Sequence, residues 1–306
     1  MRSYLAVLVT VLFWGAAFSA IRAGLSGYSA GHLVLLRFLI ASAVLFVIWL
    51  ARGRKPLAWR DLPAVALLGL LGMTIYPLAL TIGEQTVASG TASILVNLSP
   101  IFTALLGALL LGERLPRLAW LGVAIAFSGA AIIALSRGAR LELTTGVLLV
   151  LLAALVQGAQ FVLMKSLLRK YDAVTLTVFS VFCGTAFDLI STRGLVDAVR
   201  HAALDATLAV VFLGVLATAV ATITWSIALA RVAASTTVMF LYLVAPVSLL
   251  VAWVWLGEVP APVTIAGGIV SIAGVALVRY ASAGGVRISR SFASLRMTAA
   301  IKPPSS

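Results

Sequence analysis

The dominant pattern along the chain is a series of apolar runs, each about twenty residues long, separated by short polar segments. A helix of about twenty residues is long enough to cross the ~30 Å hydrocarbon core of a bilayer. Strands of a membrane barrel would instead alternate apolar and polar residues over about ten positions, and this alternation does not recur here. The pattern predicts an all-α integral membrane protein with ten transmembrane helices, at residues 4–21, 32–50, 62–80, 89–111, 118–135, 146–168, 174–190, 207–230, 235–256 and 263–280.

The composition supports a membrane environment. Of the 306 residues, 62% are hydrophobic and 10% are charged, and the mean hydropathy is +1.16. Soluble domains carry about 25% charged residues. The segments between the predicted helices are too short for a further domain, so the lipid bilayer is the expected partner of most of the surface. Residues 281–306 are polar and basic, and we expect them to form a disordered cytoplasmic tail.

The two halves of the chain resemble each other in the order of their polar and small residues. Without a gap, four positions of the first half pair with four of the second: Trp14 with Gln157, Phe18 with Phe161, Arg22 with Lys165, and Tyr28 with Tyr171. Later glycines keep spacings of ten and seven in both halves: Gly112, Gly122 and Gly129, and Gly257, Gly267 and Gly274. Five helices per half is an odd number, so the second half starts on the other side of the membrane. We therefore predict two inverted five-helix repeats, residues 1–138 and 139–280, with a substrate site between them.

A proline and a Gly-Glu pair recur in both halves, as "SPIFTALLGALLLGER" and "APVSLLVAWVWLGE". Pro100 and Pro246 each remove a backbone hydrogen bond and can bend their helices. Gly can end a helix, and Glu is tolerated near the membrane interface. Glu113 is then placed on the cytoplasmic side and Glu258 on the outer side. Each carboxylate is either a solvated helix end or a gating acid.

These phrases, with "FWGAAFSAIRAG" and "LLRFLIAS" in the first two predicted helices, resemble the EamA-type branch of the drug/metabolite transporter superfamily over about residues 4–280. The resemblance implies a ten-helix secondary transporter. The implied substrates are broad, including amino acids, nucleobases, vitamins and phosphorylated sugars. The chain departs from a strict repeat in "LTIGEQTVASG", where the stretch from the leucine to the serine is three residues longer than "LARVAAS" in the second half.

The basic residues predict the orientation. With the N-terminus inside, fifteen Lys and Arg residues lie on the cytoplasmic side and five lie outside. This is the bias expected of cytoplasmic loops. We therefore predict a multi-pass protein of the cell inner (cytoplasmic) membrane, with both termini in the cytoplasm. The bias also explains the net charge of +13, so nucleic-acid binding is not needed to account for it. The basic residues lie in loops between helices and do not form a basic domain.

The candidate substrate-binding residues are polar or aromatic groups placed within the spans: Trp14, Arg37, Tyr76, Ser93, Asn97, Gln157, Gln160, Trp225 and Tyr242. Amides supply both donors and acceptors, which suits an amphoteric ligand. Structural alternatives are hydrogen bonds between helices, and for Arg37 a side chain that extends to the interface. No Asp or Glu lies near the centre of a predicted span. We therefore expect transport without an obligatory proton gradient.

These features favour a secondary transporter that exports a small polar or amphoteric metabolite, an amino acid or similar, by alternating access. A scaffold or lipid-handling protein and a membrane enzyme are the alternatives. The chain has no HExxH, Gly-x-Ser-x-Gly or Walker sequence, so we expect neither an enzyme nor direct use of ATP. Its single cysteine, Cys183, predicts neither a disulfide nor a thiolate metal site, and no cofactor is expected. The oligomeric state is left open, and a monomer is compatible with the sequence.

Overall fold

The computed structural model describes residues 2–53, 55–111, 116–135, 144–168, 170–225, 240–277 and 280–281, and none of these residues forms a strand. Six of the described helices are long and apolar enough to cross a membrane: Leu5–Gly24, Ala30–Ala51, Trp59–Gly83, Thr145–Met164, Val174–Ser191 and Leu204–Trp225. Three shorter apolar helices are Arg117–Gly129, Val244–Leu256 and Pro262–Leu277. The all-helical class is confirmed for the described residues. The count of ten spans and their inverted arrangement stay predictions.

The labelled elements follow the chain in this order: α1 (Arg2–Gly24), α2 (Ala30–Ala51), η1 (Trp59–Asp61), α3 (Leu62–Gly69), η2 (Leu70–Ile75), α4 (Tyr76–Gly83), α5 (Ser89–Val96), α6 (Ser99–Leu111), α7 (Arg117–Leu135), α8 (Thr145–Leu167), α9 (Ala173–Asp188), η3 (Leu189–Ser191), α10 (Leu195–His201), α11 (Leu204–Phe212), η4 (Leu213–Val220), η5 (Phe240–Leu243) and α14 (Val244–Leu256). The short helix α10 lies between two predicted spans and was not expected from the sequence.

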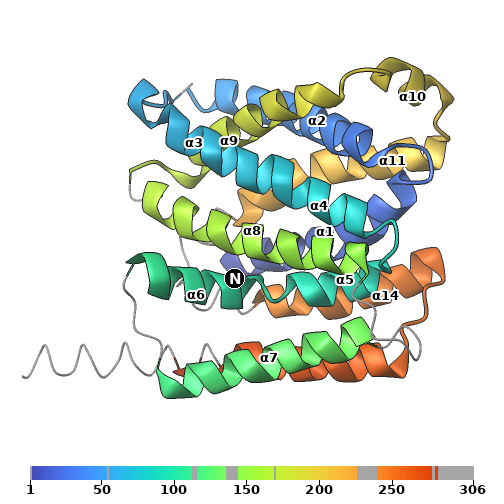
Figure 1. Cartoon of the computed structure of the whole chain (residues 1–306). Helices are drawn as coiled ribbons and strands as arrows, with labels where there is room; N and C mark the ends of the chain where they lie inside the picture. The colour runs from blue at the N-terminus through green and yellow to red at the C-terminus, as the bar shows by residue number, and fades with distance from the viewer. Residues whose placement is uncertain are drawn as a thin grey trace, which may run out of the picture.

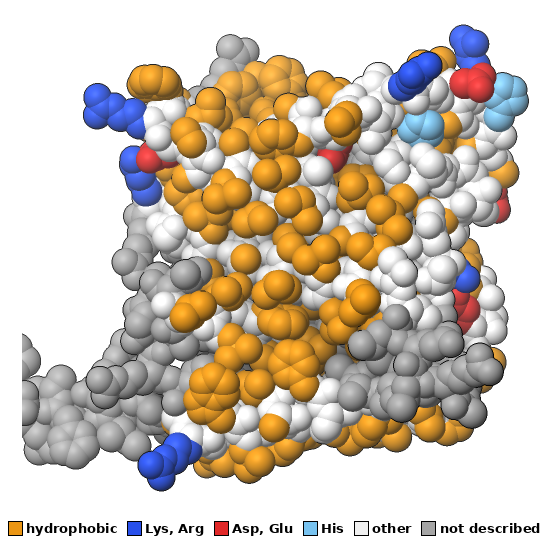
Figure 2. All heavy atoms as spheres, in the orientation of Figure 1, with side chains coloured by type: hydrophobic (Ala, Val, Ile, Leu, Met, Phe, Trp, Pro, Cys, Tyr) orange, Lys and Arg blue, Asp and Glu red, His pale blue; other side chains and the backbone are white. Residues whose placement is uncertain are grey.

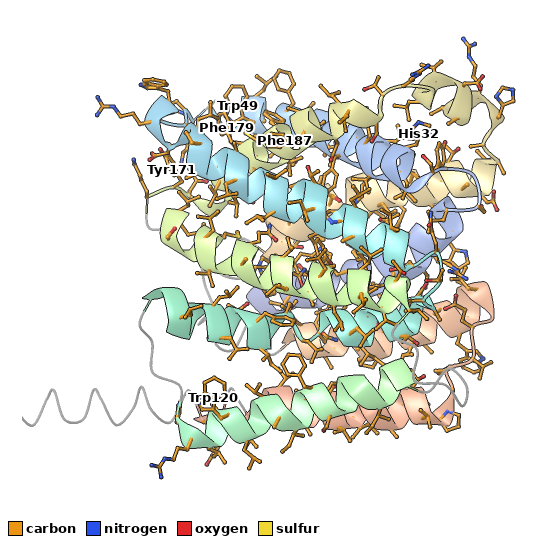
Figure 3. All side chains as sticks on the ribbon, viewed as in Figure 1. His32, Trp49, Trp120, Tyr171, Phe179 and Phe187 are labelled. Carbon is orange, nitrogen blue, oxygen red and sulfur yellow. The ribbon has the colours of Figure 1, made fainter. Side chains whose placement is uncertain are left out.

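The helices run roughly side by side, so their ends gather at two opposite ends of the molecule (Figure 1). The visible face is mostly hydrophobic between these ends, and most of its Lys, Arg, Asp, Glu and His side chains lie toward the ends (Figure 2). Figure 3 places Tyr171, Trp49 and Trp120 toward one end and His32 toward the other. Trp120 is 56% exposed. An apolar belt with aromatic residues near its edges is typical of a protein that spans a bilayer.

Three elements of the first half recur at one constant distance in the second. The starts of α1, α2 and η2 are each followed 143 positions later by the starts of α8, α9 and η4. The helix caps recur as well. The Ser29 side chain accepts a hydrogen bond from the N–H of His32 before α2, and Asp172 accepts one from Thr175 before α9. The sequence similarity is therefore matched by helix boundaries and caps.

The predicted continuous helix over residues 89–111 is wrong, because the chain leaves the helical path at Asn97 and Leu98 and restarts at Ser99. In an unbroken helix Pro100 would have to donate a hydrogen bond to the carbonyl of Val96, but proline has no N–H and its ring would clash there. In the first turn of a new helix the missing N–H costs nothing. The proline thus places a break in the middle of the bundle.

Two long helices contain π-helical segments where the sequence predicted regular helices. These segments are η2, between α3 and α4, and η4, which follows α11. A π-helix bonds each N–H to the carbonyl five residues back, which shifts backbone groups out of the regular ladder and is frequent at functional sites. Both segments border the cavity described below.

The Gly-Glu pair of the second half ends α14, as predicted. Gly257 has a φ of 67°, which glycine adopts without strain, and its N–H donates to the Trp253 carbonyl at 3.1 Å. The N–H of Glu258 donates to the Ala252 carbonyl at 3.1 Å. Glu113, the corresponding acid of the first half, lies outside the described residues.

The repeated glycines join α7 to the helix Pro262–Leu277, which form the lowest layer of Figure 1. A Cβ on Gly129 would lie 2.6 Å from the Gly267 carbonyl oxygen, and one on Gly274 would lie 2.6 Å from the Gly122 carbonyl oxygen. The glycines therefore bring these two backbones into direct contact, in agreement with the predicted packing role.

Candidate functional site

A cavity of about 150 Å³ lies within the bundle. Its walls come from α1, α2, η2 and α4 in the first half of the chain, and from α8, α9, η4 and α14 in the second. The break between α5 and α6 also reaches it, through Asn97 and Ser99. Both halves of the sequence therefore build one hollow at the position where a substrate site was predicted.

The cavity collects most of the predicted site residues. Seven of them line it: Trp14, Arg37, Tyr76, Asn97, Gln157, Gln160 and Trp225. Ser93 does not line it, because this side chain is buried and its hydroxyl donates to the Gly90 carbonyl at 2.7 Å. The side chain of Tyr242 lies outside the described residues. The assignment of these residues to substrate binding stays a prediction.

Arg37 is the one charged side chain among the described residues that line the cavity. Its Nε donates to the Thr218 hydroxyl at 2.8 Å, and its guanidinium carbon lies 5.3 Å from the centre of the Phe38 ring. None of the ion pairs among the described residues includes Arg37. A guanidinium has five N–H donors, so most of them remain available to a carboxylate in the cavity. The alternative of extension to the interface does not fit this inward contact with η4.

The aromatic wall of the cavity depends on the π-segment η4. Trp14 donates its indole N–H to the Ala217 carbonyl of η4 at 3.0 Å. Its ring centre lies 5.4 Å from that of Trp225, at an interplanar angle of 43°. An indole held by a backbone carbonyl and a second ring has a fixed orientation. The two tryptophans therefore form a rigid apolar surface for part of a ligand.

The amide side chains differ in how far the protein itself satisfies them. Gln157 hydrogen-bonds the side chain of Tyr76, so it serves the structure as well as the cavity. The Nδ2 of Asn97 is buried and has no hydrogen-bond partner among the residues that the structure describes. A buried donor without a partner costs about 1–3 kcal/mol, which a ligand or a water in the cavity would relieve.

Gln160 depends on a glycine for its position. Its side-chain amide passes over Gly72 of η2, where a Cβ would lie 2.0 Å from Nε2. Only a residue without a side chain leaves room for this amide. The pairing of Gly72 with Gln160 therefore connects the two halves across the cavity.

Several lining residues were not expected from the sequence, among them three with hydroxyl side chains and one phenylalanine: Ser99, Phe161, Ser180 and Thr218. A signal existed for two of them. Phe161 pairs with Phe18 in the repeat, and both line the cavity. Ser180 follows Arg37 by the same 143 positions that separate Trp14 from Gln157. The repeat thus places a neutral hydroxyl where the other half has a cation.

Among the residues that the structure describes, no group of three or more His, Cys, Asp or Glu side chains could hold a metal ion. Cys183 is a free cysteine of α9.

The helical bundle, its apolar surface and its central cavity define the class of a multi-pass membrane protein with an internal solute-sized hollow. The model of the EamA-like transporter family matches residues 1–135 and again residues 144–280. The chain therefore belongs to the EamA-like transporter family, and this confirms the resemblance stated from the sequence.

Similar proteins carry transporter names. A probable terminal-alkyne amino-acid exporter of Streptantibioticus cattleyicolor is 41% identical over 91% of this chain and 94% of its own length. The uncharacterized transporter YdfC of Bacillus subtilis is 37% identical over 86% of each chain. One solved crystal structure is similar with a TM-score of 0.61 at 21% identity, covering 90% of this chain and 94% of that one. The likeness to that structure supports the fold alone.

Proposed function

We propose that the protein is a secondary transporter that exports a small amphoteric metabolite with a carboxylate, such as an amino acid, across the cytoplasmic membrane by alternating access. The observation that supports this proposal most is the guanidinium of Arg37, which forms no ion pair with any described residue and lies in a cavity of otherwise neutral described residues. Arg37 and the Nδ2 of Asn97 donate hydrogen bonds to the carboxylate. The side-chain oxygen of Gln157 accepts a hydrogen bond from the amino group, and the tryptophan pair contacts the side chain of the substrate. The name of the exporter from Streptantibioticus cattleyicolor favours an amino acid in this role.

Alternating access requires two halves that can rock about the site, and the glycine contacts support such a pair. Gly129 lies against Gly267, and Gly122 lies against Gly274, so the two helices run antiparallel to each other. Because Gly122 corresponds to Gly267 and Gly129 to Gly274 in the repeat, this contact is reciprocal. A reciprocal contact between antiparallel helices is what a two-fold axis across them produces. It supports two inverted repeats. Ten helices in such repeats put both termini on the same side of the membrane, and the bias of Lys and Arg residues favours the cytoplasm as that side.

The transport assay uses purified protein in liposomes loaded with unlabelled amino acid, with uptake of labelled amino acid by exchange as the readout. We expect exchange without a pH gradient. The amide of the same amino acid should compete about 10- to 100-fold more weakly, because it cannot form the charge-assisted bonds to Arg37.

The variant Arg37→Gln tests the same contact from the protein side. It should lose affinity for the amino acid by a similar factor and no longer distinguish the acid from its amide. Exposed Arg193→Gln, at an end of the bundle, is the matched control and should behave as the wild type. Equal competition by acid and amide in the wild type would overturn the assignment of Arg37. Absence of exchange for a whole panel of amino acids would overturn the substrate class.

A further inference from the structure

A cluster of two acids, one arginine and one helix start lies at the end of the bundle that was predicted to face outward. Arg22 belongs to the last turn of α1, and Glu84 follows α4. Ser89 begins α5, and Glu258 follows α14. The cluster therefore joins the ends of α1, α4, α5 and α14.

Glu258 is well satisfied by its neighbours. Its Oε2 accepts a hydrogen bond from the Ser89 N–H at 3.1 Å, and its Oε1 lies 3.7 Å from the Nε of Arg22. A carboxylate at a helix start also gains from the positive end of the helix dipole. Arg22 in addition donates to the backbone carbonyl of Glu84 rather than to its carboxylate. The cation of the cluster is thus engaged with Glu258 and with a backbone group.

Glu84 is buried without comparable partners. Its exposed fraction is 0%, and its Oε1 has no hydrogen-bond partner in the described part of the chain. Its Oε2 accepts a hydrogen bond from the Ser89 hydroxyl at 3.4 Å. This carboxyl is buried beside the negative charge of Glu258, which favours its neutral, protonated form.

The charged and titratable groups around Glu84 act in opposite directions. Burial and the charge of Glu258 raise the pKa of the Glu84 carboxyl well above its ordinary value, against the hydrogen bond from Ser89 and the more distant charges of Arg22 and Arg37. Tyr76, on α4, is the further titratable neighbour. On the α8 side, a Cβ on Gly83, the residue before Glu84, would lie 2.7 Å from the Val150 side chain and 3.0 Å from the Gly146 carbonyl oxygen, and neither group is titratable.

The cluster separates two hollows. Ile21 and Leu80 line the central cavity. Ile21 precedes Arg22 in the sequence, and Leu80 lies one helical turn before Glu84. On the other side, a depression at the surface is lined by Arg22, Leu25, Ser26 and Gln85. The cluster therefore lies where the cavity would have to open toward this end.

We propose that Glu84, held against Glu258, Arg22 and Ser89, is a proton-binding site that closes this end of the cavity, and that loss of its proton opens it. Closing takes up one proton from the solution on this side, and opening returns it, so the proton controls the gate without driving transport. The inference rests on the proposed function only in treating this end as the exit for substrate.

The direction of the pH effect follows from the raised pKa. The closed form holds its proton more tightly than the open form, in which Glu84 meets water. Acid therefore favours the closed form, fully so below the ordinary carboxyl pKa of about 4.5. As pH rises from there to the raised pKa of Glu84, the ratio of closed to open molecules falls by up to tenfold per pH unit for one proton.

The test is a distance measurement across the depression, made without substrate. Spin labels are attached at Ser26→Cys and Gln85→Cys, both at exposed positions, in a Cys183→Ala background. In lipid nanodiscs between pH 5 and pH 9.5 we expect one short distance at low pH and a growing longer distance as pH rises. A wild-type distance distribution that does not change over this range overturns the proposal.

Three variants locate the proton. Glu84→Gln resembles the protonated acid and should stay closed at every pH, whereas Glu84→Asp should restore a pH response. Asp188→Asn is the matched control, since Asp188 is another buried acid and its Oδ2 has no hydrogen-bond partner among the described residues. It should respond to pH as the wild type does.

A pH response that persists in Glu84→Gln, or that disappears in Asp188→Asn, contradicts the proposal. Because no substrate is present, failure of amino-acid exchange would leave this result interpretable.

Discussion

At the scale of single residues, Asn97 is the clearest candidate for a group that serves the ligand rather than the fold. Its Nδ2 is buried and has no hydrogen-bond partner in the part of the chain that the structure describes, and the chain break before Pro100 places this residue at the cavity. Asn97→Leu should therefore weaken amino-acid binding about fivefold, the effect of losing ~1 kcal/mol, with no loss of thermal stability. Gln157→Leu should weaken binding and also lower the melting temperature, because Gln157 bonds Tyr76. Titration by tryptophan fluorescence and thermal melting separate the two outcomes. A lowered melting temperature with normal binding in Asn97→Leu would make this residue structural.

A second residue-scale prediction concerns Gly72 and Gln160. A methyl group on Gly72 would collide with the end of the Gln160 side chain, which can swing away at little cost to the backbone. Gly72→Ala should thus reduce affinity about as much as Gln160→Ala, roughly fivefold. The double variant should be no weaker than either single variant, because both changes remove the same amide. Binding titrations of all three variants check this, and additive losses would mean that the two positions act separately.

At the scale of elements, the sequence predicted the helices well and their interruptions poorly. Apolar runs of about twenty residues located the helical segments because length and hydropathy decide whether a helix can cross a bilayer. The break at Asn97 and the π-segments η2 and η4 depend on which backbone carbonyls find partners in other helices. Trp14 is held in place by the hydrogen bond that it donates to the Ala217 carbonyl. This partner can be identified only when the packing of α1 against η4 is known. The seven lining residues were identifiable because polar groups within apolar runs need partners inside the bundle.

An element-scale prediction tests the contact between α7 and the helix Pro262–Leu277. A Cβ at Gly129 would lie 2.4 Å from the Ser271 nitrogen, and one at Gly274 would lie 2.3 Å from the Ala126 nitrogen. Backbone atoms cannot swing aside, so each Gly→Ala change should destabilise the protein by about 1–3 kcal/mol. Ala124→Leu, at an exposed position of α7, is the control and should melt as the wild type does. Thermal melting in detergent measures all three, and unchanged stability of both alanine variants would show that the helices do not meet as described.

At the scale of the whole molecule, the family and the doubled family match agree with the repeat read from the sequence, but the orientation in the membrane is still a prediction. The bundle gathers the 55–58 and 170–172 segments at one end, where Lys55 lies 3.4 Å from Asp172. The opposite end carries Arg193, whose carbonyl contacts His32 at 3.0 Å. Because Lys and Arg concentrate in the segments of the first end, we expect that end in the cytoplasm.

Cysteine labelling of intact cells decides the orientation. In a Cys183→Ala background, Lys55→Cys should be protected from a membrane-impermeant thiol reagent, because its loop lies in the cytoplasm. Arg193→Cys should react, because it lies at the outer end. Both positions are exposed in the folded protein, so burial cannot explain a difference between them. Permeabilised cells should label both variants equally, which controls for expression. Labelling of Lys55→Cys with protection of Arg193→Cys in intact cells would reverse the orientation, and it would place the Glu84 gate and the direction of export on the other side of the membrane.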